Sequence, residues 1–363
     1  MLYILILFLL FLLLFGIGFY YYRLINRIIS VFNKDILKKK RILILLVIIF
    51  TLLSINLFSI IGVFFMHFIC ISLIIDLIYL IFKKFIKNKK IINIYKLCLL
   101  PLMISIIVLG YGFINMINIV ETKYTIYTDK EIGEDIRVLL LTDSHYGDIF
   151  KKSNLDKLKK RLDEVSADVV ILGGDIVDEG TTKEEMEYIF KVFGSIKNKY
   201  GIYFVYGNHD EQQYNMNRKY SYDELNEAIT TNNIYILNDN YMPINSNIVI
   251  AGRNDYSMGR KDIDTYLDVS KDNYLIMVDH QPVEYLENID FGIDLIVSGH
   301  THGGQIFPIE MFIKLFHTAD LSYGYGRFDN MDVIVSSGVA GWGYPIRTSH
   351  NSEYVVIDIK KSN

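Results

Sequence analysis

The sequence predicts an α/β fold preceded by membrane-spanning helices, and two observations support this prediction. Residues 1–120 are dominated by Ile, Leu and Phe with clustered Lys and Arg, whereas residues 121–363 mix charged, polar and apolar types as a globular domain does. From Ile136 onward, short apolar strands alternate with amphipathic helices, which is typical of an α/β layer fold. We therefore divide the chain into a transmembrane region at 1–122 and one globular domain at 123–363.

The N-terminal region contains enough apolar sequence for four membrane spans, at about 2–22, 42–60, 63–82 and 97–120. About 20 helical residues cross the hydrocarbon core of a bilayer. The apolar stretch 42–82 is about twice that length, so we expect it to fold as two helices. Residues 2–22 lack the basic start and the small-residue cleavage site of a signal peptide, so we expect a retained anchor.

Basic residues predict the orientation of these spans. Lys and Arg are concentrated in 23–41 and 83–96, and both segments should face the cytoplasm. They can share one side only if 42–82 crosses twice or not at all. Two crossings give a multi-pass protein of the cell membrane whose globular domain lies outside the cytoplasm. Asp76 and His67 lie inside the apolar stretches; we favour places in the bundle interior over a polar pathway or a transporter.

Charge and cysteine content exclude several function classes. The net charge is −4, so a nucleic-acid partner is not indicated. Both cysteines, Cys70 and Cys98, lie in the apolar region, so the globular domain has no disulfide, CxxC metal site or cysteine nucleophile. No protein partner can be inferred from the sequence.

Apolar periodicity locates the elements of the globular domain. Ser153 with Asp156, and Ser221 with Glu224, resemble capping boxes at two helix starts. The expected strands are 136–142, 168–173, 201–206, 247–251, 274–278, 293–298, 332–336 and 354–359, and the expected helices are about 154–165, 182–198 and 222–231.

Five blocks of polar residues follow these strands directly. In open α/β sheets, ligands bind where the carboxyl ends of neighbouring strands converge. Carboxylate and amide oxygens together with imidazole nitrogens suit Mn, Fe or Zn ions. Each block alone is weakly specific, but the ordered set predicts a metal site. The blocks are Asp143-Ser144-His145, Gly174-Asp175-Ile176-Val177-Asp178, Gly207-Asn208-His209-Asp210, Asp279-His280 and Gly299-His300-Thr301-His302.

These blocks resemble the D-x-H, G-D-x-x-D, G-N-H-D, H and G-H-x-H motifs of the calcineurin-like metallophosphoesterase superfamily, over about residues 136–359. The sequence GHTHGGQ, from Gly299 to Gln305, is similar to that of bacterial membrane-associated members. The resemblance implies a four-layer α/β/β/α sandwich following the transmembrane helices. Ser144, and Asn351 to Glu353, depart from the usual pattern without removing a metal ligand.

The resemblance also implies two divalent metal ions and the residues that hold them. One metal would be bound by Asp143, His145, Asp175 and His302. The other would be bound by Asp175, Asn208, His280 and His300, with Asp175 as the bridge. His209 and Asp210 are the expected catalytic residues: His209 would stabilise the phosphoryl group or protonate the leaving oxygen, and Asp210 would orient it. Asp178 would support the metal ligands.

The function implied is a membrane-anchored phosphohydrolase that cleaves phosphoester or pyrophosphate bonds of a phosphorylated substrate. The anchor suggests a lipid-linked or envelope substrate. The alternative is a non-catalytic membrane scaffold or sensor with the same fold, although such a protein would be expected to have lost ligands. Arg253 and Arg347 are further candidates, either to clamp a phosphate or to pair with a carboxylate.

Overall fold

The computed structural model describes residues 2–32, 40–56, 59–147 and 149–362. The chain forms two compact units, unit 1 at Met1–Tyr111 and unit 2 at Gly112–Asn363. Part of the basic segment 23–41 lies outside the described residues, including Lys34, Lys38 and Lys39.

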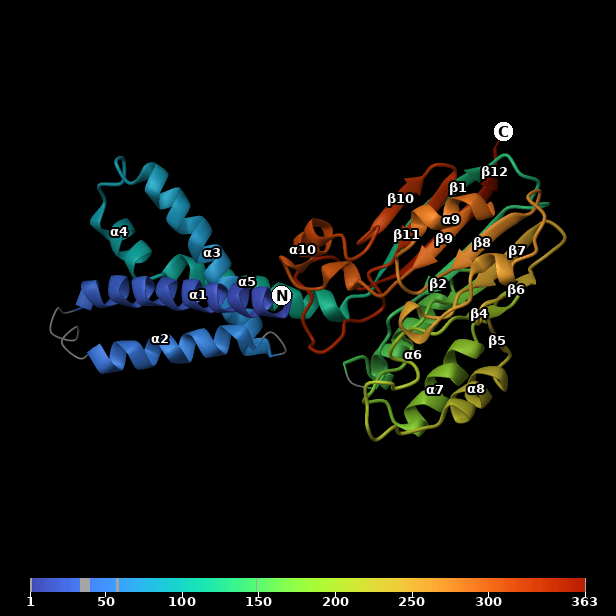
Figure 1. The fold of residues 1–363 in the computed structure, drawn as a ribbon, viewed down its shortest axis with the longest axis horizontal. Coiled ribbons are helices and arrows are strands. Elements are labelled where there is room, and N and C mark those ends of the chain that lie inside the picture. Colours follow the sequence, from blue (N-terminus) through green and yellow to red (C-terminus); the bar gives the residue numbers. More distant parts are fainter. Residues whose placement is uncertain (1, 33–39, 57–58, 148, 363) are drawn as a thin grey trace. The chain divides into compact units, whose positions relative to one another are not determined.

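The first five elements are helices (Figure 1). They are α1 (Leu2–Phe32), α2 (Lys40–Ile55), α3 (Ile60–Phe82), α4 (Lys89–Lys96) and α5 (Leu99–Ile117). Three stretches are long and apolar enough to cross a membrane: Leu10–Phe32, Ile60–Phe82 and Leu99–Ile117. Helix α2 has 16 residues and rises about 24 Å, less than the roughly 30 Å of a bilayer core. The span expected at 42–60 therefore stays a prediction.

Asp76 and His67 both contact polar atoms within unit 1. Asp76 accepts a hydrogen bond from the Tyr20 hydroxyl at 3.0 Å and forms an ion pair with Arg27. Nδ1 of His67 lies 2.8 Å from the carbonyl oxygen of Val63, one helical turn away. The partners of Asp76 therefore lie on α1, and the partner of His67 lies on α3, the helix that carries both residues.

Unit 2 is built on two six-stranded sheets. The first has the order β1 (Val120–Thr128), β12 (Glu353–Lys361), β2 (Ile136–Leu141), β3 (Val169–Leu172), β4 (Ile202–Phe204) and β5 (Ile234–Ile236). The second has the order β10 (Gly324–Phe328), β11 (Met331–Val335), β9 (Leu295–Ser298), β8 (Tyr274–Val278), β7 (Ile248–Gly252) and β6 (Asn240–Pro243). The helices are α6 (Lys152–Leu162), α7 (Lys183–Gly194), α8 (Tyr222–Thr230), α9 (Tyr285–Asn288) and α10 (Ile309–Phe316).

Alternating side chains divide the interior of unit 2 into three apolar layers, because successive residues of a strand face opposite sides of the sheet. Leu139 and Leu141 of β2 pack in the cluster that also contains buried residues of α6, α7 and α8. Val138 and Leu140 pack between the two sheets. The outer face of the second sheet packs against α9 and short 3₁₀ turns. The four-layer α/β/β/α sandwich is therefore confirmed.

Strand direction places the polar blocks at one edge of the sheets. Strands β2, β3, β4 and β5 pair in parallel, with Leu141 opposite Leu172, and β7, β8, β9 and β11 are also parallel to one another. The carboxyl ends of each parallel group consequently meet. The blocks beginning at Asp143, Gly174 and Gly207 leave the first sheet there, and those beginning at Asp279 and Gly299 leave the second.

The structure contains elements that the sequence pattern did not indicate. Strands β1, β5, β6 and β10 were not expected, and the helix expected at 97–120 ends at Ile117, with β1 starting at Val120. The capping box at Ser221 is confirmed, but α6 begins after Lys151 without a side-chain cap. Strands β5 and β6 have only 3 and 4 residues, too few for an alternating pattern to stand out.

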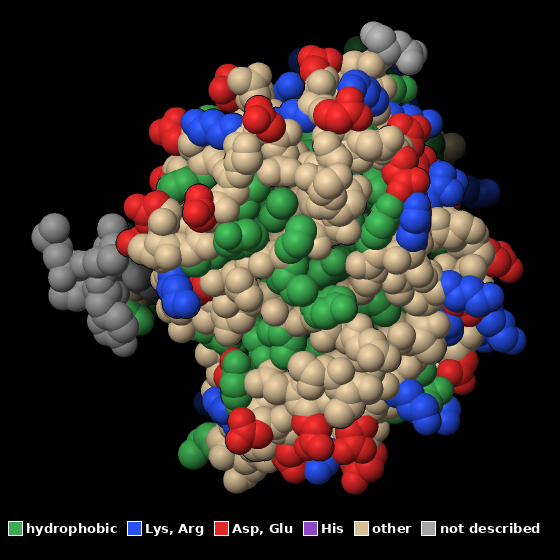
Figure 2. Space-filling model, turned by 90° about the vertical axis from the view of Figure 1, so that its right-hand side faces the viewer, with side chains coloured by type: hydrophobic (Ala, Val, Ile, Leu, Met, Phe, Trp, Pro, Cys, Tyr) green, Lys and Arg blue, Asp and Glu red, His purple; other side chains and the backbone are tan. Residues whose placement is uncertain are grey.

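Figure 2 shows one face of unit 2, seen from the right-hand side of Figure 1. Lys, Arg, Asp and Glu are interspersed around a central area of apolar side chains. Mixed charge of this kind is typical of a surface in contact with water.

Candidate metal centre

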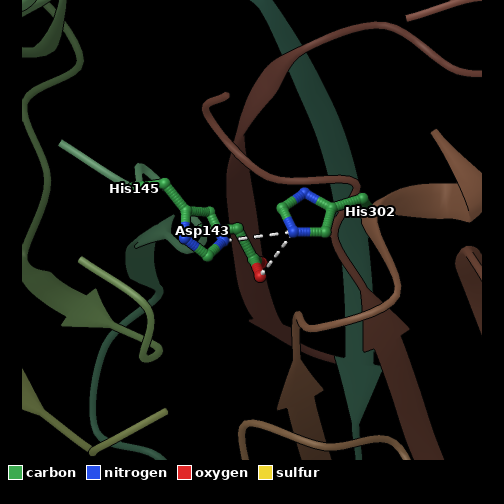
Figure 3. Close-up of side chains that lie close together, drawn as sticks. All are labelled: Asp143, His145 and His302. Carbon is green, nitrogen blue, oxygen red and sulfur yellow. Dashed lines mark hydrogen bonds and ion pairs between the residues drawn. The ribbon is translucent and has the colours of Figure 1, made fainter. Parts of the chain in front are cut away.

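The first group of converging side chains is Asp143, His145 and His302 (Figure 3). Asp143 and His145 follow β2, and His302 lies in a 3₁₀ turn, His302–Gly304, after β9. Nε2 of His145 is 3.2 Å from Nε2 of His302, and Nε2 of His302 is 3.7 Å from Oδ1 of Asp143. One donor atom from each side chain lies within 4.8 Å of the others, which is compatible with a shared cation.

The second group is Asp175, His280 and His300, with Asn208 beside it. Nε2 of His280 is 3.1 Å from Oδ2 of Asp175. Nδ1 of His300 is 3.0 Å from Oδ1 of Asn208. These residues follow four different strands, β3, β8, β9 and β4, so only the folded sheets bring them together.

Asp175 lies between the two groups. Its Oδ2 is 3.1 Å from Nε2 of His280 and 3.7 Å from Nε2 of His145. The seven residues expected to be metal ligands therefore form two adjacent clusters that share the Asp175 carboxylate. Two adjacent clusters of nitrogen and oxygen donors that share one carboxylate are compatible with two neighbouring divalent cations.

The backbone at these residues is unusual. Asp143, His145, Asp175, His300 and His302 have positive φ angles of 52°, 39°, 52°, 68° and 50°. A residue other than glycine in this conformation costs about 1–3 kcal/mol, and such residues gather at functional sites. The strain is the cost of turning each side chain inward directly after its strand ends.

Two glycines allow the loops to approach the acidic side chains closely. A Cβ atom on Gly299 would lie 2.2 Å from Oδ2 of Asp143, and one on Gly207 would lie 2.2 Å from Oδ1 of Asp175. Neither position can therefore carry a side chain without moving a carboxylate.

The contacts of the Asp210 side chain are with the backbone of the loops around Asp175. Its buried carboxylate accepts hydrogen bonds from the backbone N–H groups of Asp175, Ile176, Val177 and Gly207, at 2.8, 2.8, 3.1 and 2.7 Å. The side chain thus joins the loops that follow β3 and β4. It acts on the site by holding the backbone of Asp175.

Glu179 orients His209, and the sequence reasoning missed it. Oε2 of Glu179 lies 2.6 Å from Nδ1 of His209, and the backbone N–H of His209 donates to Oδ1 of Asp175 at 2.8 Å. Burial by itself lowers the pKa of His209. The hydrogen bond to Glu179 and the negative charge of Asp175 raise it by more than that, so the pKa is raised to about 9. Glu179 directly follows the block that ends at Asp178, so an acidic residue there was the available signal.

Electrostatics and hydrogen bonding test whether the clusters fit metal ions. Burial lowers the pKa of His302 to about 3, which keeps its imidazole neutral, as a metal ligand must be. The buried nitrogens Nε2 of His280 and Nδ1 of His145 lie 3.1 Å from Oδ2 of Asp175 and 3.6 Å from Oδ2 of Asp178, and neither contact has the geometry of a hydrogen bond. Donors of this type, without thiolate, fit divalent ions of the Mn, Fe and Zn class.

The two arginine candidates are both engaged by the protein. Arg347 is fully buried, and its guanidinium donates to the carbonyl oxygens of His302 at 2.9 Å and Ala340 at 2.7 Å. Nη1 of Arg253 is 3.2 Å from Glu284 and 3.5 Å from Asp279. Arg347 therefore braces the loops around His302 and is not placed to clamp a phosphate.

Known proteins that are similar to this chain include several metallophosphoesterases. The model of the calcineurin-like phosphoesterase family matches residues 136–304. An uncharacterized metallophosphoesterase of Campylobacter jejuni is 31% identical over 284 residues, covering 74% of this chain and 70% of the relative. A transmembrane protein with metallophosphoesterase domain of Danio rerio is 24% identical over 287 residues, which cover 74% of this chain and 64% of the relative. Among solved structures, a dimetal phosphatase from Danio rerio covers 62% of this chain and 93% of its own, with 12% identity and a TM-score of 0.40.

Proposed function

This chain belongs to the calcineurin-like metallophosphoesterase family, and from that premise we propose that it hydrolyses phosphoester or pyrophosphate bonds at a dinuclear metal centre. The observation that carries the proposal is the convergence of two nitrogen- and oxygen-donor clusters on the single carboxylate of Asp175. A scaffold that had lost catalysis would not need to maintain this strained arrangement.

The proposed ligands are the seven residues named from the sequence. Asp143, His145 and His302 would hold one ion, Asn208, His280 and His300 would hold the other, and Asp175 would bridge them. When bound, two divalent ions would neutralise phosphoryl oxygens. They would also lower the pKa of a water molecule, so that hydroxide is available to attack phosphorus near neutral pH.

The remaining polar residues would position and charge the site. His209, whose pKa is raised to about 9, would carry a positive charge at neutral pH and offer its ring to the phosphoryl group or the leaving oxygen. Glu179 fixes the orientation of that ring through Nδ1. Asp210 and Arg347 keep the backbone of Asp175 and His302 in place.

The natural substrate would be a phosphorylated compound of the membrane or envelope, with a lipid-linked phosphate ester or pyrophosphate as the specific proposal. Three helices long and apolar enough to span a bilayer support membrane association. The Danio rerio relative is also described as a transmembrane protein. A catalytic unit tethered to a bilayer meets lipid-linked substrates at high local concentration.

The proposed topology is multi-pass, with unit 2 outside the cytoplasm. It rests on the two basic segments and on 42–82 crossing twice. A reporter that is active only in the cytoplasm, fused after Asn363, should be silent. Activity of that reporter would overturn the orientation.

The hydrolase proposal is tested on the full chain purified in detergent. With Mn²⁺ present, bis-p-nitrophenyl phosphate should be hydrolysed, and the activity should be lost in Asp175→Ala and His302→Ala. His317→Ala is the matched control, because His317 is exposed and belongs to neither cluster. Metal analysis should give close to two ions per chain. A metal content near zero, with no turnover of any phosphate ester, would contradict the proposal.

A further inference from the structure

Helix α10, which follows the metal-binding turn, presents apolar side chains to the outside. Met311, Phe312, Leu315 and Phe316 have relative exposures of 62%, 50%, 66% and 67%, and Phe307 just before the helix has 45%. All eight residues of α10 are described, and none of them is buried. We call the set Phe307, Met311, Phe312, Leu315 and Phe316 the α10 surface.

One acidic side chain of the same helix, Glu310, is turned toward the protein, whereas Lys314 is exposed. Glu310 accepts a hydrogen bond from the Ser322 hydroxyl at 3.0 Å and lies 3.0 Å from Nε2 of His350. It also forms an ion pair with Lys314 at 2.7 Å. A helix on a water-soluble protein normally directs its apolar stripe inward. In α10 two apolar residues, Ile309 and Ile313, are partly buried, but four others face outward, so the surroundings of the α10 surface should themselves be apolar.

Hydrogen bonds connect α10 to the end of an apolar helix of membrane-spanning length. Helix α5 is such a helix, and its last residues, from Gly112 to Ile117, belong to unit 2. Nδ2 of Asn115 donates to the carbonyl oxygens of Arg347 at 3.1 Å and His350 at 3.0 Å. His350 in turn contacts Glu310 of α10. The C-terminal end of α5, where a spanning helix would leave the bilayer, is therefore linked to α10 through one residue, His350.

That end of α5 also carries exposed apolar side chains. Ile114 and Ile117 have relative exposures of 62% and 66%. They and the α10 surface are thus joined through the same loop of unit 2. An exposed apolar area of this composition marks an interaction site, and the partner whose presence α5 already requires is the lipid bilayer.

The same loop is bonded to the metal centre. Gln305, the last residue of the GHTHGGQ sequence, donates from Nε2 to the carbonyl oxygens of Trp342 at 3.1 Å and Tyr344 at 3.2 Å. Arg347 donates to the carbonyl oxygen of His302. The ring of Trp342 lies 5.5 Å from that of His209. A bilayer touching α10 would therefore lie beside the metal centre.

We propose that the α10 surface lies in the lipid–water interface of the bilayer that α5 crosses, and that its partner is phospholipid. Aromatic and aliphatic side chains bury in the acyl boundary, while the exposed ammonium of Lys314 reaches headgroup phosphates. The metal centre then works at the level of the headgroups. Binding to lipid does not depend on hydrolysis, so this proposal and the proposed function can fail separately.

The test places one tryptophan on α10 in the full chain, reconstituted into phosphatidylcholine vesicles with and without brominated acyl chains. The chain has a single tryptophan, so Trp342→Phe provides a silent background. Phe316→Trp is the reporter, at 67% exposure. Tyr127→Trp is the matched control, at 64% exposure. Strand β1 begins at Val120, close to the end of α5, and Tyr127 lies seven residues further along the strand. This separation corresponds to about 23 Å.

Brominated lipid should quench and unbrominated lipid should blue-shift the emission of the Phe316→Trp reporter, while the Tyr127→Trp control should show neither effect. Leu315→Trp is a second reporter on the same side of α10, and circular dichroism identifies any variant that has not folded. Equal emission of the α10 reporters with and without bromine would overturn the proposal. If that emission were blue-shifted, the surface would be covered by protein, from unit 1 or a second copy, and not by lipid.

Discussion

Replacing Arg347 with methionine should weaken the first metal cluster without touching a ligand. The guanidinium is fully buried and donates to the carbonyl oxygens of His302 and Ala340. Burial lowers the pKa of Arg347 to about 10, so the side chain still carries its charge at neutral pH. Methionine has similar length but no donor, and both carbonyl groups would lose a charged partner.

The magnitude follows from these contacts. Each hydrogen bond from a charged donor is worth about 1.5–3 kcal/mol, or about 3–6 kcal/mol for two. The buried guanidinium also carries a desolvation penalty, because its Nε has no hydrogen-bond partner among the described residues. Removing the guanidinium relieves that penalty and offsets the loss by on the order of 1–3 kcal/mol. The free energy of unfolding of unit 2 should therefore fall by about 2–4 kcal/mol. At about 2–4 °C per kcal/mol, Tm should fall by about 4–16 °C.

The assay combines thermal unfolding, followed by the fluorescence of Trp342, with metal analysis of the purified chain. The Arg347→Met variant should hold fewer ions than the parent because the backbone of His302 is no longer braced. Arg218→Met, at an exposed position, is the control and should match the parent. Unchanged Tm and metal content with a raised KM for a phosphate ester would refute this reasoning, since that pattern indicates a substrate contact.

Three further predictions concern the metal centre. Gly299→Ala should displace the Asp143 carboxylate and lower the metal content by about one ion per chain. The control Gly326→Ala would place its new methyl group against flexible side chains only, and its metal content should be unchanged. Equal metal contents of the two variants would count against the steric argument. Glu179→Gln should keep both metals but lower kcat by about 10–100-fold, because His209 loses its charged partner; steady-state kinetics would contradict this with an unchanged kcat. Chelation of the metals should lower Tm, since ions at 100 times their Kd stabilise a protein by about 2.7 kcal/mol each; calorimetry that shows no shift would argue against resident metals.

The candidate metal-ligand set could be chosen from the sequence because it depends on local order in the chain. Asp143 and Asp175 each follow an apolar strand within a few residues, and parallel strands bring their carboxyl ends to one edge. The four-layer fold followed from the same alternation of strands and helices. Short edge strands such as β5 and β6 were missed, because 3 and 4 residues hold too little periodic signal.

The contacts of the residues around the site could not be read from the sequence, for a different reason. Asp210 was expected to orient His209, but the fold places its carboxylate among four backbone N–H groups instead. Arg347 was expected to contact substrate or a carboxylate, but it binds two carbonyl oxygens. In both cases the residue type was noticed, and its partner could not be read from the chain.

By itself, the sequence determined the donor set, the order of the blocks and the presence of apolar helices ahead of the catalytic unit. The tertiary structure decided which carboxylate lies between the two clusters, which acid holds His209, and how α5, the loop of Arg347 and α10 are bonded together. Strand periodicity and motif spacing are local properties of the chain. A hydrogen bond between Asn115 and His350 spans 235 residues, and only the packing of the whole unit brings such partners within reach.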